Sequence, residues 1–246
     1  MIIGSNLIFI ENLPSTNSYA GKLLRSQTPT EGTIIYTNYQ SAGRGHLGNR
    51  WESEDGKNLI ISIILSPSMI SPSDQFIISM AISLGICDFL NRYIPFCSIK
   101  WPNDIYVNND KIAGILIENS IMGYQIEYSI AGIGLNINQE KFLSDAPNPV
   151  SLKLITGISL DLITCLNQLA SDLDKRYKQI ISESYDLIRN DYLSRLYRLN
   201  EWFNFKDSGG IYSGRILSVS DIGRLQIERK SGLRSEYSFK EIEFIL

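Results

Sequence analysis

The 246-residue sequence has few of the residues that build metal sites and disulfide frameworks. It contains three cysteines, Cys87, Cys97 and Cys165, and a single histidine, His46. The cysteines are scattered without C-x-x-C spacing, and with one histidine they do not make an ordinary zinc site. An odd and sparse set of cysteines also argues against a disulfide framework. These absences favour a reduced, cytoplasmic location.

Long hydrophobic runs and an excess of positive charge are lacking too. The longest nearly apolar run, LIISIIL at residues 59–65, is too short to cross a bilayer. The first residues lack the basic start and small-residue cleavage site of a secretory signal. A net charge of -3 argues against a protein built mainly to bind DNA or an anionic membrane. The sequence therefore predicts an ordinary globular protein without a nucleic-acid or membrane partner.

The spacing of apolar residues predicts an α+β fold. Strands are expected where short β-rich runs occur, at residues 6–10, 33–37, 58–65, 105–107, 112–118 and 128–137. Helices are expected where apolar residues recur at helical spacing. The first is expected to begin with the cap Ser71 and Pro72 and to run to about residue 90, and two more are expected at about 159–181 and 183–198. Strands around a few helices in irregular order indicate the α+β class.

The pattern changes after Trp202. Apolar and polar residues then alternate, with turns expected at 221–223 and 230–232. This alternation predicts a small all-β domain over residues 201–246, after a larger domain over residues 1–200.

Residues 41–51, SAGRGHLGNRW, gather three glycines, two arginines and the only histidine, and end on a tryptophan. Taken alone, a Gly-rich stretch is most simply a connection between strands. Alternatively, its glycines let backbone N–H groups approach an anion while arginine side chains hold the anion's oxygens. The letters fit G-x-G-x-x-G, but no helix pattern follows, and no Walker A sequence occurs in the chain. The segment is a candidate anion-binding loop and not a dinucleotide-binding motif.

Residues 100–118, KWPNDIYVNNDKIAGILIE, form a second informative stretch. Taken alone, Lys111 could be a solvated strand start, and Asn103 with Asp104 a simple turn. Together with residues 41–51 they supply cations and amides, while the sequence offers no histidine-based nucleophile pair. That combination suits a reaction in which the protein clamps phosphates and neutralises developing charge, and the substrates provide the nucleophile and the leaving group.

The order of several short motifs resembles the biotin–protein ligases. These motifs are PSTN (14–17), Q-S-A-GRG-x-x-G-x-x-W-x-S (40–53), KWPND (100–104), KxxGIL (111–116), GIGLNIN (132–138) and the ending SFKEIEFIL. Each is weak alone, and the resemblance depends on their joint order over nearly the whole chain. It implies a mixed sheet with flanking helices, as in class II synthetases, and a small C-terminal SH3-like β-barrel. Because only fourteen residues precede Ser15, it also implies a monofunctional form without the DNA-binding domain of some relatives.

The resemblance implies a reaction in two steps. The carboxylate of biotin attacks the α-phosphate of ATP, and a lysine amine of a carrier protein then takes biotin from biotinyl-5'-AMP. Because both nucleophiles belong to substrates, the lack of a Ser-His or Cys-His pair is expected. Biotin and ATP are then the substrates, and Mg²⁺ is expected with ATP, without assigned protein ligands. The implied acceptor is the biotinyl domain of a carboxylase such as acetyl-CoA carboxylase.

The same resemblance assigns the site residues. Lys111 is expected to bridge the biotin carboxylate and the phosphate as the main catalytic cation, with Arg44 as the second. The biotin end is expected to contain Ser15, Thr16, Asn17, Gln40, Gly43, Arg44, Gly45, Lys111 and Gly114. The nucleotide end is expected to contain Arg44, Gly45, His46, Trp51, Lys100, Asn103 and Asn136. A Gly-rich loop that orders over the ligand would shield the reactive adenylate from water.

His46 departs from the family pattern, in which this loop position is usually arginine or glutamine. Histidine carries full charge only below a pKa of about 6.5. If the imidazolium binds the adenylate, release of the adenylate should become faster as pH rises from roughly 6 to 8.

Two alternative functions are a lipoate–protein ligase and a sensor that binds biotin or its adenylate without transferring it. The pairing of GRGxxG with KWPND argues against the lipoate enzyme, and Lys100 and Lys111 argue against the sensor.

Overall fold

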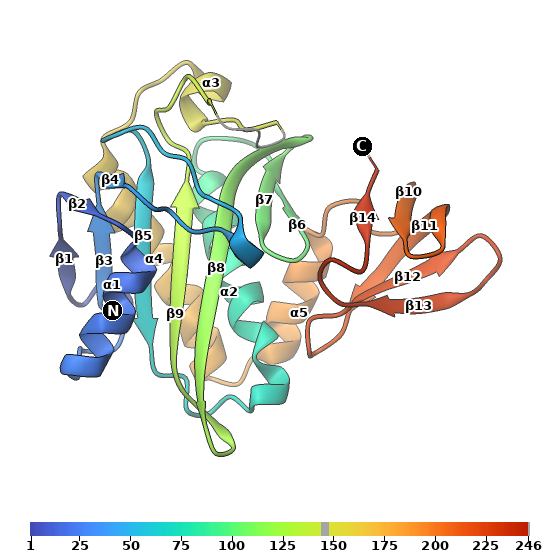
Figure 1. Ribbon diagram of the computed structural model, residues 1–246, viewed down its shortest axis with the longest axis horizontal. Helices are drawn as coiled ribbons and strands as arrows, with labels where there is room; N and C mark the ends of the chain where they lie inside the picture. The colour runs from blue at the N-terminus through green and yellow to red at the C-terminus, as the bar shows by residue number, and fades with distance from the viewer. Residues whose placement is uncertain (144–147, 246) are drawn as a thin grey trace.

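The computed structural model describes residues 1–143 and 148–245; Leu246, the last residue of the predicted second domain, lies outside them. The larger of its sheets has seven strands of mixed direction (Figure 1). Their order in space is β1 (Leu7–Phe9), β3 (Ile34–Thr37), β5 (Leu59–Leu65), β9 (Gln125–Leu135), β8 (Asp110–Met122), β7 (Asp104–Val107) and β6 (Ser98–Lys100). Within the described residues, β1 and β3 pair in parallel, and each of the other neighbouring pairs of this sheet is antiparallel. The predicted mixed sheet is confirmed.

Helices cover both faces of this sheet (Figure 1). α2 (Phe76–Leu90) and α4 (Leu162–Ile181) pack against each other behind the sheet, and α5 (Tyr185–Ser194) packs against α2. α1 (Thr16–Ser26) lies on the opposite face against β3, β5 and β9. Side chains of successive strand residues point to opposite faces, so Ile34 belongs to the large core cluster and Ile35 to the smaller one under α1.

The helix predictions need several corrections. Ser71 caps a short 3-10 helix over Pro72–Asp74, and α2 begins only at Phe76. α1 was not predicted, although Ser15 caps it by accepting a hydrogen bond from the Ser18 N–H at 3.4 Å. α4 begins at Leu162 because the Asp161 carboxylate caps it, through the Thr164 N–H at 2.7 Å. α5 ends at Ser194, before the expected residue 198. Short elements complete this part: β2 (Asn12–Leu13) with β4 (Tyr39–Gln40), α3 (Leu152–Thr156), η1 (His46–Gly48) and η2 (Pro72–Asp74).

The second sheet has five antiparallel strands (Figure 1). Their order is β13 (Arg234–Tyr237), β12 (Leu225–Arg229), β11 (Gly210–Val219), β10 (Trp202–Asp207) and β14 (Glu243–Phe244). These strands lie within residues 201–246, where the sequence predicts a small all-β domain. One buried cluster contains residues of both parts, for example Leu84 of α2 and Phe205 of β10. The division into domains at residues 200 and 201 therefore stays a prediction.

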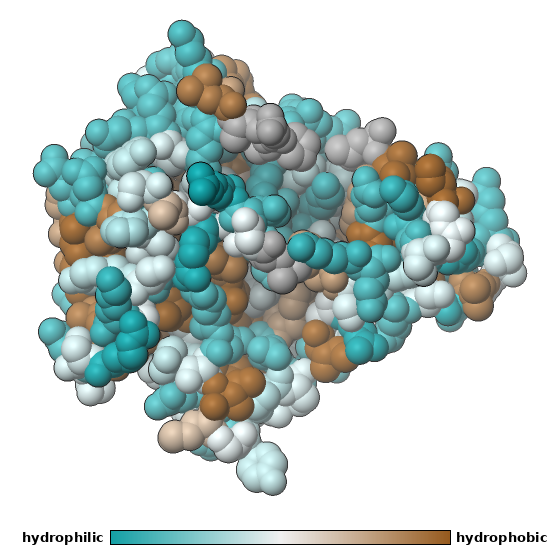
Figure 2. All heavy atoms as spheres, in the orientation of Figure 1, coloured by the Kyte–Doolittle hydropathy of each residue, from teal (hydrophilic) through white to brown (hydrophobic). Residues whose placement is uncertain are grey.

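The stretch Pro72–Leu90 is long and apolar enough to cross a membrane by length and composition alone. In the structure 67% of its apolar window is buried inside the protein, and α2 packs on α4 and α5. A helix that is apolar on all sides is expected where other elements surround it. On the face shown in Figure 2, hydrophobic residues form small separate groups among hydrophilic ones. The apolar composition of α2 therefore reflects its place in the core.

Candidate active site

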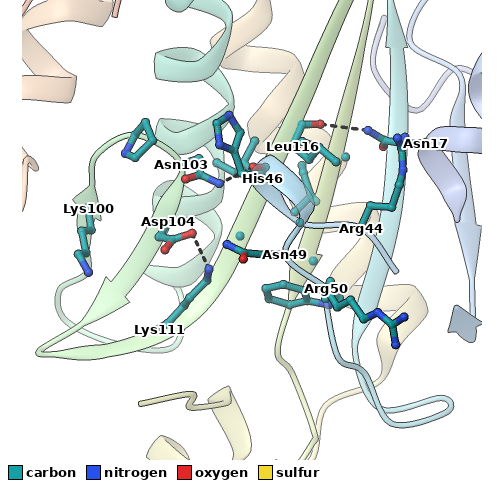
Figure 3. A pocket seen from close by; sticks show the side chains of 18 of the residues that line it. Asn17, Arg44, His46, Asn49, Arg50, Lys100, Asn103, Asp104, Lys111 and Leu116 are labelled. Atoms are coloured by element: carbon teal, nitrogen blue, oxygen red, sulfur yellow. Dashed lines mark hydrogen bonds and ion pairs between the residues drawn. The ribbon is translucent and has the colours of Figure 1, made fainter. Parts of the chain in front are cut away.

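A cavity of about 290 Å³ lies between the large sheet, the second sheet and residues 41–51, which we call the lid. It gathers residues from distant parts of the chain (Figure 3). Most of the predicted site residues line it: Ser15, Thr16, Asn17, Gln40, Arg44, Gly45, His46, Trp51, Lys100, Asn103, Lys111 and Gly114. The motifs that the sequence separates by up to a hundred residues thus meet in one place.

Gly43 and Asn136, also predicted as site residues, lie beside the cavity and not in its lining. The Gly43 carbonyl accepts a hydrogen bond from the Trp51 N–H at 3.1 Å, and a Cβ at Gly43 would lie 2.5 Å from the Trp51 carbonyl oxygen. Asn136 is 3% exposed, and its Nδ2 donates to the Val150 carbonyl at 3.0 Å. Both residues shape the backbone around the cavity, and their contacts with biotin and nucleotide stay predictions.

One end of the cavity is a buried network of neutral polar side chains. The Gln40 Oε1 accepts hydrogen bonds from the Thr16 N–H at 2.7 Å and from its hydroxyl at 3.1 Å. The Ser62 Oγ lies 2.7 Å from the Thr16 Oγ1 and 2.5 Å from the Asn17 Oδ1. At Gly132 a Cβ would lie 2.3 Å from that Asn17 oxygen, so β9 needs glycine there. This end suits a neutral ligand group rich in hydrogen-bonding atoms, because its own polar groups are fixed in position.

Glu118 connects this end to the lid. The Asn17 Nδ2 donates to the Leu116 carbonyl at 3.2 Å and to the Glu118 Oε2 at 2.8 Å. The Arg44 Nη2 donates to the same Glu118 oxygen at 2.7 Å, and the Arg44 side chain points toward Asn17 in Figure 3. Glu118 was not predicted as a site residue. A strand period of two places it on the same face of β8 as Gly114, which is the signal that could have indicated it.

Lys111 and Asp104 form an ion pair in the middle of the cavity. β7 and β8 pair in an antiparallel hairpin, and the Lys111 Nζ lies 2.6 Å from the Asp104 Oδ1. Both side chains are about three-quarters buried, so neither charge is fully exposed to water. The Asn49 side chain of the lid points toward this pair (Figure 3). Lys111 therefore presents a cation to the cavity from strand β8, and its role as the main catalytic cation stays a prediction.

Lys100 and Asn103 lie at the other end of the cavity. The Lys100 Nζ donates to the Tyr106 hydroxyl at 3.0 Å and lies 5.3 Å from the centre of the Phe244 ring. Burial lowers the pKa of Lys100, an effect that the nearby Asp104 carboxylate opposes. The Asn103 Nδ2 donates to the Ile115 carbonyl at 2.9 Å, which fixes the amide at the wall.

The Trp51 ring covers two glycines of the large sheet. Gly114 of β8 and Gly134 of β9 are direct partners in the ladder. A Cβ at Gly134 would lie 2.2 Å from the Trp51 Cε2, and one at Gly114 would lie 2.9 Å from its Cζ3. Gly114 is one of the residues expected at the biotin end, and in this structure its close neighbour is the indole ring of Trp51. The two glycines thus let the end of the lid lie flat on the sheet.

The lid itself is a narrow loop. An isolated bridge joins Arg44 and Arg50, and the Gly45 N–H donates to the Asn49 carbonyl at 2.7 Å. The Arg50 side chain points away from the Lys111–Asp104 pair in Figure 3. Both arginines line the cavity, and Arg44 does so near the neutral polar end. Of the two side chains, that of Arg44 is the one that points toward Asn17 (Figure 3).

His46 is partly buried against the second sheet and not turned to solvent. Its ring meets that of Phe239 edge to face, with centroids 4.3 Å apart and an interplanar angle of 85°. Burial lowers the pKa of His46 below its ordinary value; Asp104 partly opposes this shift and Lys240 adds to it. The direction is opposite to what a retained imidazolium would require, because burial favours the neutral ring.

The carboxylates that line the cavity are each paired with a cation. They are Asp104 with Lys111 and Glu243 with Lys206, the second pair at 3.5 Å; Glu118, which pairs with Arg44, is not part of the lining. No group of three or more metal-ligating side chains occurs among the described residues. Mg²⁺ binds readily through substrate phosphates with one or two carboxylates. These residues do not fit a metal cage made by the protein, so an ion would enter with the phosphates of ATP.

Comparisons with known proteins identify the family. Residues 9–136 match the biotin/lipoate A/B protein ligase family. The bifunctional ligase/repressor BirA of Bacillus subtilis is 28% identical over 245 residues, which covers 96% of this chain and 74% of that protein. The biotin–[acetyl-CoA-carboxylase] ligase of Paracoccus denitrificans is 30% identical over 232 residues, with coverages of 89% and 92%. The biotin protein ligase of Aquifex aeolicus, solved in complex with biotin and ATP, superposes with a TM-score of 0.80 at 25% identity and covers 97% and 98% of the two chains. The chain belongs to the biotin/lipoate A/B protein ligase family and, within it, to the biotin–protein ligases.

Proposed function

We propose that this cavity binds biotin at its neutral polar end, binds ATP toward Lys100 and Asn103, and joins the two at Lys111. The observation that carries this proposal is the position of Lys111, whose charged end lies between the two halves of the cavity and under the lid. A buried, neutral network suits the uncharged ring system of biotin, whose carboxylate would then extend toward the cation.

In the first step, a carboxylate oxygen of biotin forms a bond to the α-phosphorus of ATP, and the bond from that phosphorus to the bridging oxygen of pyrophosphate breaks. The two reactants are both anionic. Unit charges about 4 Å apart repel by about 4 kcal/mol at an effective dielectric of about 20, so a cation between them lowers the barrier. Lys111 supplies a point charge, and Arg44 supplies a planar fork that can hold two oxygens.

In the second step, the amine of an acceptor lysine attacks the acyl carbon of biotinyl-5'-AMP. A carbon–nitrogen bond forms, the carbon–oxygen bond to the phosphate breaks, and AMP leaves as the nitrogen loses a proton. The adenylate also reacts with water, so the lid and the Trp51 ring over the sheet would protect it until the acceptor arrives.

We also propose the partners of the reaction. The acceptor is a biotinyl carrier domain of a carboxylase, which the name of the Paracoccus relative supports. Mg²⁺ accompanies ATP and neutralises phosphate charge when bound. The location is the reducing cytoplasm, because Cys87, Cys97 and Cys165 are all buried free thiols.

A pyrophosphate-exchange assay tests this proposal. The protein is incubated with ATP, Mg²⁺ and labelled pyrophosphate, with biotin, with lipoate or with neither. We expect label to enter ATP with biotin alone. Exchange with lipoate and none with biotin would indicate a lipoate ligase. Tight binding of biotin without any exchange would indicate a sensor.

A further inference from the structure

Phe239 connects the second sheet to the lid. It lies in the turn after β13, and its ring packs on His46 edge to face at 4.3 Å. The Nδ1 of His46 is buried and has no hydrogen-bond partner among the described residues. Packing on Phe239 is therefore what holds the imidazole on this side of the lid. An aromatic pair in this geometry is favourable beyond the area that it buries.

The turn that faces Phe239 is itself fixed to the larger part of the protein. The Trp101 Nε1 donates to the Gly223 carbonyl at 2.8 Å. At Gly223 a Cβ would lie 2.6 Å from the Phe76 ring, so the turn between β11 and β12 packs closely on α2. The Trp101 and Phe239 ring centroids are 6.1 Å apart. Phe239 is thus set on a docked surface and not on a free loop.

Phe239 also lines two cavities. A second cavity, of about 410 Å³, lies between α2 and the second sheet. It shares six lining residues with the first: His46, Trp101, Pro102, Asn103, Ile115 and Phe239. The Ser83 hydroxyl, fully buried and without a partner among the described residues, adds a polar group to its lining. Truncation of Phe239 would remove part of the wall that the two cavities share and give water more room on the nucleotide side.

We infer that Phe239 is a positioning residue of the ligase reaction, which acts through His46 to hold the nucleotide side of the lid closed. Phe239 and His46 together are called the latch. This inference rests on the proposed function, because the lid protects an adenylate only if the cavity makes one. The latch gives the second sheet a role in retaining biotinyl-5'-AMP, because Phe239 follows β13 of that sheet and its contact with His46 connects the sheet to the lid.

The test compares Phe239→Ala, Phe239→Leu, His46→Ala and the double variant His46→Ala/Phe239→Ala. Leu233→Ala is the matched control, because it truncates a 57% exposed apolar residue that lies just before β13 and lines neither cavity. Phe239→Leu keeps an apolar side chain in the wall and so protects the fold, while it removes the ring edge. For each protein the release rate of preformed biotinyl-5'-AMP is measured, together with biotin-dependent formation of AMP without an acceptor.

We expect Phe239→Ala and His46→Ala each to speed adenylate release about 2- to 10-fold, the size of one aromatic pair. AMP formation without an acceptor should rise with Phe239→Ala, and melting temperatures should stay near that of Leu233→Ala. The double variant should release the adenylate no faster than His46→Ala alone, because both changes break the same contact.

Wild-type release rates in both Phe239 variants would overturn the latch, and so would effects that add in full in the double variant. Failure of the proposed function gives a different result, since the wild-type protein and Leu233→Ala would then form no adenylate from biotin and ATP.

Discussion

The Nζ of Lys111 lies 2.6 Å from the Oδ1 of Asp104, across the paired strands β7 and β8. The pair holds the lysine in the cavity before any substrate arrives, so little rearrangement is needed when an anion enters. In the proposed reaction, a substrate carboxylate or phosphate would replace the aspartate as the partner of the ammonium group. Such preorganisation is the main source of electrostatic stabilisation in enzyme sites.

Lys111→Ala should reduce adenylate formation by about 10²-fold or more, the effect of removing one preorganised charge from a developing phosphate charge. The fold should persist, because Lys111 is not part of the apolar core. The measurement is the rate of biotin-dependent pyrophosphate exchange, with Lys22→Ala on the exposed side of α1 as the control. Near-normal exchange in Lys111→Ala would show that this lysine is not the catalytic cation.

Gly134→Ala should displace the Trp51 ring and weaken lid closure. The added Cβ would lie 2.2 Å from the indole, while the backbone conformation of Gly134 accepts a side chain. We expect slower adenylate formation and a change in tryptophan fluorescence, with the far-UV circular dichroism retained. Gly209→Ala, where the nearest atom is the flexible Asp207 side chain at 3.3 Å, is the control. Unchanged fluorescence in Gly134→Ala would contradict the flat packing of the ring.

Glu118→Gln should free Arg44 for the substrate while its amide oxygen still accepts from Asn17. Both members of the Arg44–Glu118 pair are about 40% exposed, so solvent screens the pair and its contribution is about 0.2–1 kcal/mol. We expect KM for ATP to fall by roughly 1.5- to 5-fold at low salt, and less at high salt. The exposed Glu11→Gln is the control. A rise in KM would mean that the pair orders the lid for binding.

Release of the adenylate should become faster as pH falls below about 6.5. In the closed lid, burial lowers the pKa of His46. The charge of Asp104 partly opposes this shift, and the charge of Lys240 adds to it. In the open lid the ring regains its ordinary value of about 6.5. Protonation in this window favours the open form, and the effect levels off below the lowered pKa. His46→Gln should abolish the dependence. Faster release from pH 6 toward 8 would instead support a binding imidazolium.

The sequence motifs predicted most of the cavity lining, because the residue types in each motif can be read from the sequence without knowledge of the fold. Ser15, Thr16 and Asn17 were assigned to the biotin end, and the structure places them in the lining. The helix α1, which Ser15 caps and which contains Thr16 and Asn17, was not predicted, although Tyr19, Ala20 and Leu23 have helical spacing. Their apolar stripe is short, and turn-forming residues surround it, so local preference did not decide between helix and loop.

Contacts between segments that are distant in the sequence do not follow from the sequence pattern. Glu118 lies 101 residues from Asn17 and 74 from Arg44, and the three meet only because α1 and the lid both pack beside β8. The contact of His46 with Phe239 depends likewise on how the second sheet docks against the first. Such contacts follow from tertiary packing, which the spacing of residues along one element does not reveal.

Transfer of biotin to an acceptor lysine is the most direct test of the proposed ligase reaction. The protein is incubated with biotin, ATP, Mg²⁺ and a biotinyl carrier domain, and the intact mass of the carrier is measured. The control is the same domain with its acceptor lysine replaced by arginine. We expect the carrier to gain one biotin at that lysine, with both biotin and ATP required and Lys111→Ala inactive. An unmodified carrier in the presence of wild-type protein, or one modified by lipoate and not by biotin, would contradict the account.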